Sequence, residues 1–213
     1  MSLVVEPFEN RMRRGGEMAI REAARFFMRE DPVHRSLQKI TAKLEQMEIP
    51  YAVAGAMALV AHGYDRTTVD VDVLLPADAS SRVHAALDGL GYPPAFVGST
   101  ALRDSETGVR IDFLVAGQFP RDGRPKPVAF SDPSTASVEI GGIRFLSLER
   151  LIELKLASGM TNAGRIKDLA DVQELIRVLR LNASADRLDA FVRPKYSELW
   201  SAVASTKDSG PFS

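Results

Sequence analysis

Two short segments of the chain alternate hydrophobic residues with aspartates at a period of two. In residues 69–75, valines flank Asp70 and Asp72, and in residues 109–115 the apolar odd positions flank Asp112. Successive side chains of a β-strand point to opposite faces of its sheet. Each segment is therefore predicted to form a strand that buries one face and presents its carboxylates on the other.

The hydrophobic pattern also predicts a hairpin and two further short strands. The pair Gly141-Gly142 separates two apolar runs, which is typical of a tight β-hairpin. The hairpin strands are expected at residues 138–140 and 143–146, and the two further strands at residues 51–54 and 100–103.

Apolar residues at helical spacing predict that most of the remaining chain is helical. Asp31 is the expected N-cap of a helix that begins at Pro32, and Ser147 that of the first helix after the hairpin. Gly63 is expected just past the end of another helix. The predicted helices cover residues 17–29, 32–47, 56–62 and 78–90, a stretch that starts at 148, and residues 165–181, 184–192 and 194–204. Residues 1–16 are expected to be a loose lead-in, residues 117–135 a loop, and the residues from Lys207 a frayed tail.

This order of elements predicts an α/β (α+β) fold. A small mixed sheet flanked by helices is followed by a C-terminal helical part. We expect N-terminal helices over residues 1–49, a core over residues 50–146 and a helical region over residues 147–206.

Composition narrows the classes of function. The 213 residues carry a net charge of −1, which argues against a broad nucleic-acid surface. The small cluster of Arg11, Arg13 and Arg14 is interpreted as a solvated terminus rather than a nucleic-acid arm. The absence of cysteine excludes disulfides and thiolate chemistry. No long apolar run or signal-peptide core is present, so a cytoplasmic protein without a membrane partner is expected.

The candidate chemistry lies in the paired aspartates. Asp70 and Asp72 would repel each other on one strand face, and a cation between them would remove that cost. If the second strand lies alongside, Asp112 becomes a third carboxylate, and such a set can hold two Mg²⁺ ions that clamp phosphates. The alternative is three solvated aspartates on an exposed sheet face.

Gly55 and Arg66, which precede the paired aspartates in the sequence, also support the hypothesis of a phosphate site. Gly55 lies at a predicted strand-to-helix turn, where backbone N–H groups can approach a phosphate. It could equally be an ordinary glycine at a helix start. Arg66 could neutralise a phosphate or pair with an acid.

Residues 53–75, VAGAMALVAHGYDRTTVDVDVLL, resemble the signature of polymerase-beta-like nucleotidyltransferases. The segment is especially similar to the bacterial branch of minimal nucleotidyltransferases and abortive-infection toxins, in which a glycine turn, His-Gly and Arg-x-Thr-x-Asp-x-Asp follow in order. The resemblance covers residues 50–115. It continues more weakly over residues 147–176, with Leu-x-x-Leu-Ile-x-x-Lys-Leu and Arg-x-Lys-Asp-x-x-Asp.

The resemblance implies a role for each matched residue. Asp70, Asp72 and Asp112 would bind the two catalytic Mg²⁺ ions, and Asp112 would also prepare the attacking hydroxyl. The residues that would contact the nucleoside triphosphate are Gly55, Ala56, Arg66, Thr68, Lys155 and Lys167. Arg165, Asp168 and Asp171 fall in the second motif with less defined roles.

Some of these positions have ordinary alternatives. The family often has Ser or Gly where this chain has Ala56, so a hydroxyl that could bind the terminal phosphate is lost. Lys155 could instead extend along the edge of the core, and Lys167 could pair with Asp171 one helical turn away.

The resemblance implies a Mg²⁺-dependent transfer of a nucleotidyl group to an acceptor hydroxyl on an RNA, a protein or a small molecule such as an aminoglycoside. The main alternative is a catalytically inactive binding or regulatory protein, for instance a toxin–antitoxin component. Either could act as a homo-oligomer or with a partner protein. A third reading is an unrelated metal-binding domain with structural acids.

Overall fold

The structure is a computed structural model, and it describes residues 6–13, 16, 25–26, 30–87, 89–119 and 127–208. Its centre is a six-stranded mixed sheet with the order β3-β4-β2-β1-β6-β5. The strands are β1 (Ala52–Val53), β2 (Asp70–Leu75), β3 (Leu102–Arg103), β4 (Arg110–Val115), β5 (Ser137–Ile140) and β6 (Ile143–Leu146). β2 runs parallel to β4 and antiparallel to β1, so the predicted mixed sheet is confirmed.

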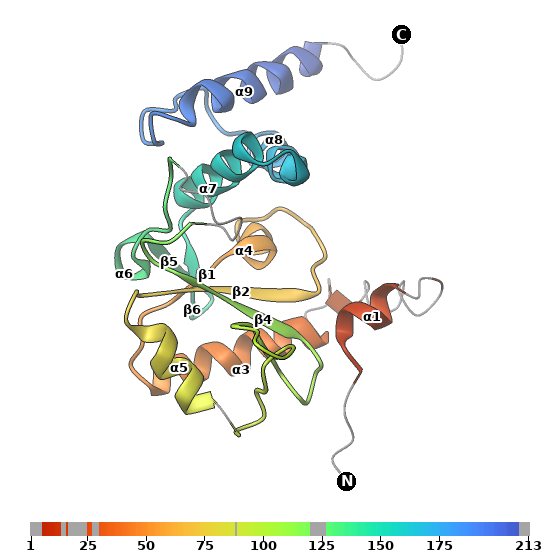
Figure 1. The fold of residues 1–213 in the computed structure, drawn as a ribbon. Helices are drawn as coiled ribbons and strands as arrows, with labels where there is room; N and C mark the ends of the chain where they lie inside the picture. The colour runs from red at the N-terminus through yellow and green to blue at the C-terminus, as the bar shows by residue number, and fades with distance from the viewer. Residues whose placement is uncertain are drawn as a thin grey trace.

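Helices cover both faces of the sheet (Figure 1). α3 (Pro32–Gln46) and α5 (Ala79–Leu87) lie on one face, and α4 (Gly55–Ala61) lies on the other. Beyond α4, the helical layer contains α7 (Leu148–Thr161), the short 3₁₀ turn Ala163–Arg165, α8 (Ile166–Val178) and α9 (Arg193–Asp208). The other helices in the described part of the chain are α1 (Phe8–Arg13) and α6 (Pro133–Ala136).

The helix caps follow from the sequence. Asp31 accepts hydrogen bonds from the backbone N–H groups of Val33 and His34 at 2.7 and 3.3 Å, which confirms it as the N-cap of α3. Ser147 caps α7 through the N–H of Arg150 at 3.5 Å. These caps satisfy N–H groups that have no partner within the helix.

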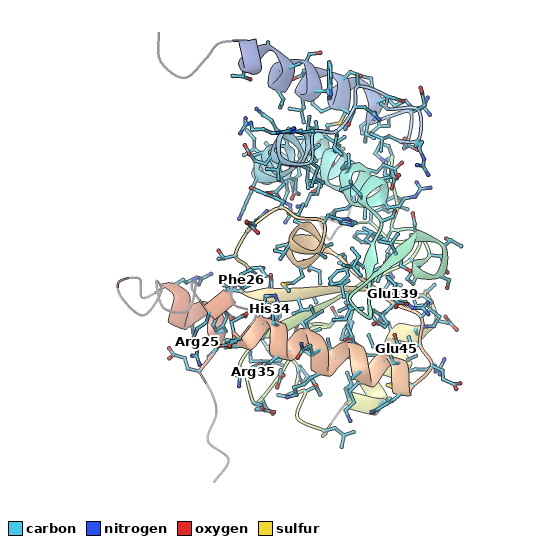
Figure 2. The ribbon with its side chains drawn as sticks, turned by 180° about the vertical axis from the view of Figure 1, so that it is seen from behind. Arg25, Phe26, His34, Arg35, Glu45 and Glu139 are labelled. Atoms are coloured by element: carbon cyan, nitrogen blue, oxygen red, sulfur yellow. The ribbon has the colours of Figure 1, made fainter. Side chains whose placement is uncertain are left out.

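The hydrophobic core extends to both faces of the sheet, and one part of it lies between α3 and the sheet. One face of α3 buries Val33, Leu37, Ile40 and Leu44, as its spacing predicts. Seen from behind in Figure 2, α3 runs along this face with Arg35 and Glu45 on its outer side. Phe26 closes one end of the core, where its ring lies 4.9 Å from that of His34.

The predicted lead-in over residues 1–16 is wrong where the structure describes it. Phe8 begins α1 and is 2% exposed, and its N–H donates to the carbonyl of Gly108 at 3.2 Å. Arg103 binds both carboxylate oxygens of Glu9 at 2.9 and 3.1 Å. These long-range contacts order a segment whose own sequence carries no strong helix signal. Most of the helix predicted at residues 17–29 lies outside the described residues.

The helix predicted at residues 184–192 is also wrong, because the segment forms turns. The side chain of Asn182 accepts from the N–H of Ser184 at 3.1 Å, and the hydroxyl of Ser184 donates to Asp186 at 2.9 Å. Short polar side chains that bond locally in this way compete with the helical hydrogen bonds. Part of the predicted loop over residues 117–135 is the short helix α6, which Asp132 caps.

None of the helices in the described part of the chain combines the length and apolarity needed to span a membrane.

Candidate active site

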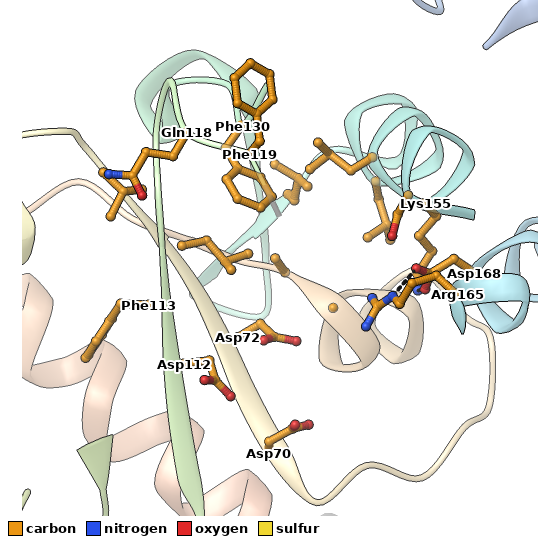
Figure 3. Close-up of a pocket in the computed structure, with 18 of the residues that line it drawn as sticks. Asp70, Asp72, Asp112, Phe113, Gln118, Phe119, Phe130, Lys155, Arg165 and Asp168 are labelled. Atoms are coloured by element: carbon orange, nitrogen blue, oxygen red, sulfur yellow. Dashed lines mark hydrogen bonds and ion pairs between the residues drawn. The ribbon is translucent and has the colours of Figure 1, made fainter. Parts of the chain in front are cut away.

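The three aspartates of the sequence motifs lie together on the face of the sheet that is turned toward the helical layer (Figure 3). β2 and β4 pair in parallel with Asp72 directly opposite Asp112 and with Asp70 opposite Arg110. The alternate residues Val71 and Ile111 are fully buried on the other face. All three carboxylates line a pocket of about 410 Å³ between the sheet and the helical layer.

Gly55 makes room for one of these carboxylates. It opens α4 directly after β1, with a φ of +60° that disfavours any residue with a side chain. A Cβ at this position would lie 1.9 Å from Oδ2 of Asp72. The glycine also lines the pocket, so the structure gives it a packing reason beside its predicted role in phosphate binding.

Arg110 stands between two of the carboxylates. Its Nη2 donates to Oδ2 of Asp70 at 2.9 Å, and its Nε donates to Oδ2 of Asp112 at 2.7 Å. The aspartates hold the guanidinium charged and raise the pKa of Arg110, although burial opposes this. Sequence reasoning missed this residue, yet the signal was present, because Arg110 is two positions before Asp112 and therefore projects from the same strand face.

The aspartates of the site differ in their hydrogen-bond partners. Thr68 donates its hydroxyl hydrogen to Oδ1 of Asp70 at 2.7 Å, so Asp70 has two partners. The backbone carbonyl of Asp72 accepts from the N–H of Ala54 at 2.9 Å, but its carboxylate receives no hydrogen bond from the described residues. Burial, together with the charges of Asp70 and Asp112, raises the pKa of Asp72 to about 7. Lys155 and Arg110 oppose this shift without cancelling it.

Part of a cluster of ion pairs forms the opposite wall of the pocket, which Lys155, Arg165 and Asp168 line. Nζ of Lys155, on α7, donates to Asp168 at 3.1 Å and to Asp171 at 2.7 Å, both on α8. Arg165 binds Asp168 at 2.8 Å, and Arg66 binds Asp171. Burial would raise the pKa of Asp168, but Lys155 and Arg165 lower it below its usual value. This ion-pair cluster of Arg66, Lys155, Arg165, Asp168 and Asp171 contains three cations and two anions.

Of the other residues predicted to contact the nucleotide, some line the pocket and others lie outside it. Lys155 lines the pocket and is 8% exposed, so it does not extend along the edge of the core. Arg66 pairs with Asp171, one of the two alternatives left open for it. Lys167 is exposed, and its expected partner Asp171 is bound by other cations. Ala56, Thr68 and Lys167 lie outside the pocket lining of the described residues.

One wall of the pocket is apolar, and sequence reasoning missed it. Phe119 and Phe130 lie above the sheet in Figure 3, on backbone segments joined by hydrogen bonds of 2.8 and 2.9 Å between residues 117–118 and Phe130. Leu151 and Leu154 face the pocket from α7. Phe119 belongs to a loop with no regular pattern, so only its spatial position reveals the role.

The donor chemistry of the site fits a hard divalent cation. Three carboxylates offer only oxygen ligands, which Mg²⁺ prefers. The guanidinium of Arg110 already acts as a positive charge between two of them. Within the described residues, no three acidic or histidine side chains converge closely enough to hold a metal ion as they stand.

No protein-family model and no curated protein sequence matches the chain. Solved structures do match. The crystal structure of ANT(2'')-Ia in complex with adenylyl-2''-tobramycin matches 81% of this chain and 97% of its own, with 17% identity and a TM-score of 0.50. An antigenic nucleotidyltransferase-like protein from Paracoccidioides brasiliensis matches 82% of this chain and 88% of its own, with 16% identity and a TM-score of 0.50. The chain therefore has the nucleotidyltransferase fold, as the resemblance of its motifs implies.

Proposed function

We propose that the protein transfers a nucleotidyl group from a nucleoside triphosphate to an acceptor hydroxyl. The observation that carries this proposal is the pairing of β2 with β4. It places three carboxylates on one side of a pocket of about 410 Å³, opposite a cationic wall. The nucleotidyltransferase fold supports the same reaction class.

The carboxylates would act at the reacting phosphate. Asp70, Asp72 and Asp112 would hold divalent cations, which when bound would polarise the α-phosphate and neutralise the leaving pyrophosphate. The acceptor oxygen would form its bond to the α-phosphorus as the bond to pyrophosphate breaks. Asp112 would take up the proton of the acceptor hydroxyl, and Thr68 would keep Asp70 oriented through its 2.7 Å hydrogen bond.

The ion-pair cluster would bind the triphosphate. Its excess of one positive charge attracts an anion, and Arg165, whose side chain is 59% exposed, can turn toward a phosphate without unfolding any element. Lys155 is already oriented by two carboxylates, so little side-chain entropy remains to be lost on binding. The apolar wall with Phe119 and Phe130 would then hold the base or the acceptor.

The acceptor that we propose to test first is suggested by a structural neighbour. ANT(2'')-Ia was solved with an adenylylated tobramycin, which makes a small-molecule acceptor the first to test. One observation favours a catalytically inactive regulatory protein, such as a toxin–antitoxin component, as a second candidate. The guanidinium of Arg110 fills the space between Asp70 and Asp112, where a catalytic cation would sit.

Calorimetric titration of ATP, GTP, CTP and UTP with Mg²⁺ tests the proposal. Wild-type protein should bind at least one triphosphate only when Mg²⁺ is present, and Asp70→Asn/Asp72→Asn should lose that binding. The matched control is Asp65→Asn/Asp78→Asn, which removes two exposed carboxylates outside the pocket and should bind as the wild type does. Well-folded wild-type protein that binds no triphosphate would sink the enzyme proposal and favour the inactive candidate.

A further inference from the structure

Among the residues that the structure describes, Arg110 is the cation that pairs with both Asp70 and Asp112. It forms charge-assisted hydrogen bonds to Oδ2 of Asp70 at 2.9 Å and to Oδ2 of Asp112 at 2.7 Å. Its own side chain is 41% exposed, whereas those of the two aspartates are 26% and 23% exposed. The guanidinium can therefore leave for solvent without disturbing the core, while the aspartates stay in place.

We propose that Arg110 occupies the cation position of the carboxylate site and that a divalent cation binds there only by displacing it. This inference rests on the proposed function, because it takes the three aspartates to be the cation ligands. Arg110 is then a positioning residue that keeps the acids assembled before substrate arrives.

Competition for the same oxygen atoms supports the exchange. Oδ2 of Asp70 and Oδ2 of Asp112 each accept a hydrogen bond from the guanidinium, so a metal ion that takes both of these oxygens as ligands competes with Arg110. This accounts for the absence, within the residues that the structure describes, of three acids converging on one point. A metal ion that takes both of these oxygens must therefore break two charge-assisted hydrogen bonds, each stronger than a neutral one.

After displacement, the guanidinium of Arg110 has different binding partners depending on whether nucleotide is present. When Mg²⁺ binds alone, Arg110 moves to solvent and only hydration replaces its two carboxylate partners. When Mg²⁺ binds with a triphosphate, the same pocket contains phosphate oxygens with which the guanidinium can pair, in the two-pronged geometry that arginine favours. Arg110 therefore makes metal binding weak without nucleotide and stronger with it.

The neighbouring strand offers a matched control for this effect. Arg103 on β3 lies directly opposite Arg110 in the sheet, but it binds Glu9 and the carbonyl of Gly108 instead of the site carboxylates. Arg103→Gln removes a nearby positive charge without touching the candidate metal ligands. Arg110→Gln removes the same charge together with the two contacts.

The experiment is calorimetric titration with Mg²⁺ alone, and then with Mg²⁺ in the presence of a non-hydrolysable triphosphate. We expect Arg110→Gln to bind Mg²⁺ alone about tenfold more tightly than wild type, as two displaced charge-assisted bonds imply, and Arg103→Gln to change it by less than about threefold. The triphosphate should raise the affinity of wild type for Mg²⁺ by a larger factor than that of Arg110→Gln.

Folding of each variant is checked by its thermal melt. If Arg110→Gln does not fold, Arg110→Lys serves in its place, because lysine keeps the charge but lacks the rigid planar fork of guanidinium donors, and a smaller gain in Mg²⁺ affinity is expected. Wild type and the Arg110 variant binding Mg²⁺ equally well would overturn the exchange and leave the proposed function standing. Failure of both to bind Mg²⁺, with and without triphosphate, would overturn the exchange and the proposed function together.

Discussion

At the scale of single residues, three aspartates of the same chemistry have three different environments. Asp70 accepts from Thr68 and Arg110, and Asp112 accepts from Arg110. Asp72 instead rests against the backbone of Gly55, where a side chain of any size would collide with it. The acid whose pKa is raised by burial is therefore also one whose carboxylate has no bonded cation among the described residues.

This asymmetry makes the stability of the metal-free protein depend on pH through Asp72. Its folded-state pKa of about 7 lies above the ordinary value of 3.8, so the folded state binds the proton more tightly than the unfolded state. The stabilisation is complete below the lower value and is lost as the pH rises toward about 7. Asp72→Asn removes the charge and should therefore raise the free energy of unfolding at pH 8 by about 1–3 kcal/mol. This range is smaller than the pKa shift alone would give, because the site is partly exposed and solvent screens the charge.

Urea denaturation between pH 5 and pH 8 in the presence of a chelator measures this effect. The wild type should lose stability with increasing pH, and the variant should show a flatter profile. The control is Asp78→Asn, which removes an exposed carboxylate away from the pocket and should leave the profile unchanged. Equal profiles for wild type and Asp72→Asn would contradict the raised pKa.

At the scale of the elements, the sequence predicts most of the framework that holds the site. The alternation in β2 and β4 placed the valines in the core and the aspartates on the opposite face, because strand geometry fixes which side chains share a face. What the alternation could not supply was the neighbour of each strand. The pairing of Asp72 with Asp112 depends on a crossover through α5 and β3, and no local pattern encodes that.

Tertiary contacts explain the elements that were missed. α1 is ordered by Phe8 in the core and by Glu9 bound to Arg103, which are partners distant in sequence. The turns at residues 184–192 are fixed in part by the N–H of Asp189, which donates to Glu153 of α7 at 2.7 Å. The ion-pair cluster likewise joins residues from α7, α8 and the segment before β2, whereas the sequence suggested a local pair of Lys167 with Asp171 and an unidentified acid as partner of Arg66.

Close packing of α7 against α8 gives a prediction at this scale. A Cβ at Gly159 would lie 2.6 Å from Cγ of Leu169, well inside contact distance. Alanine normally stabilises a helix interior by about 1 kcal/mol relative to glycine, but here the collision should dominate. Gly159→Ala is therefore expected to destabilise the protein by about 1–2 kcal/mol and to loosen the contacts of Lys155 with α8. Denaturant unfolding of Gly159→Ala, Leu169→Ala and the double variant forms a cycle in which the double variant should be more stable than the sum of the singles. Additive costs would show that Leu169 is not the obstacle.

At the scale of the whole molecule, the pocket lies between two layers that meet at few charged points. The sheet and α4 contribute the carboxylates and Gly55, and the helical layer contributes Lys155 and Arg165 (Figure 1). Asp171 joins the layers, because it binds Lys155 of α7 and also Arg66 from the segment between α4 and β2. Asp171, which is only 3% exposed, therefore links the cationic wall to the layer that contains the carboxylates, in addition to the apolar packing between the layers.

Removing the charge of Asp171 should weaken the attachment of the helical layer to the sheet and lower the free energy of unfolding. Asp171→Asn leaves Lys155 and Arg66 with Asp168 as the remaining anion of the cluster, and an uncompensated buried charge is costly, so we expect a loss of about 2–4 kcal/mol in the free energy of unfolding. The matched control is Glu174→Gln on the same helix, whose carboxylate makes a more exposed pair with Arg177 and should cost less than about 0.5 kcal/mol. Hydrogen exchange locates the effect: the amides of α7 and α8 should lose protection in Asp171→Asn, whereas those of α3, on the far face of the sheet, should lose less. A uniform loss over all elements would mean that the layers unfold as one unit, and no loss at all would mean that apolar packing of α7 on α8 holds the helical layer without the ion pairs.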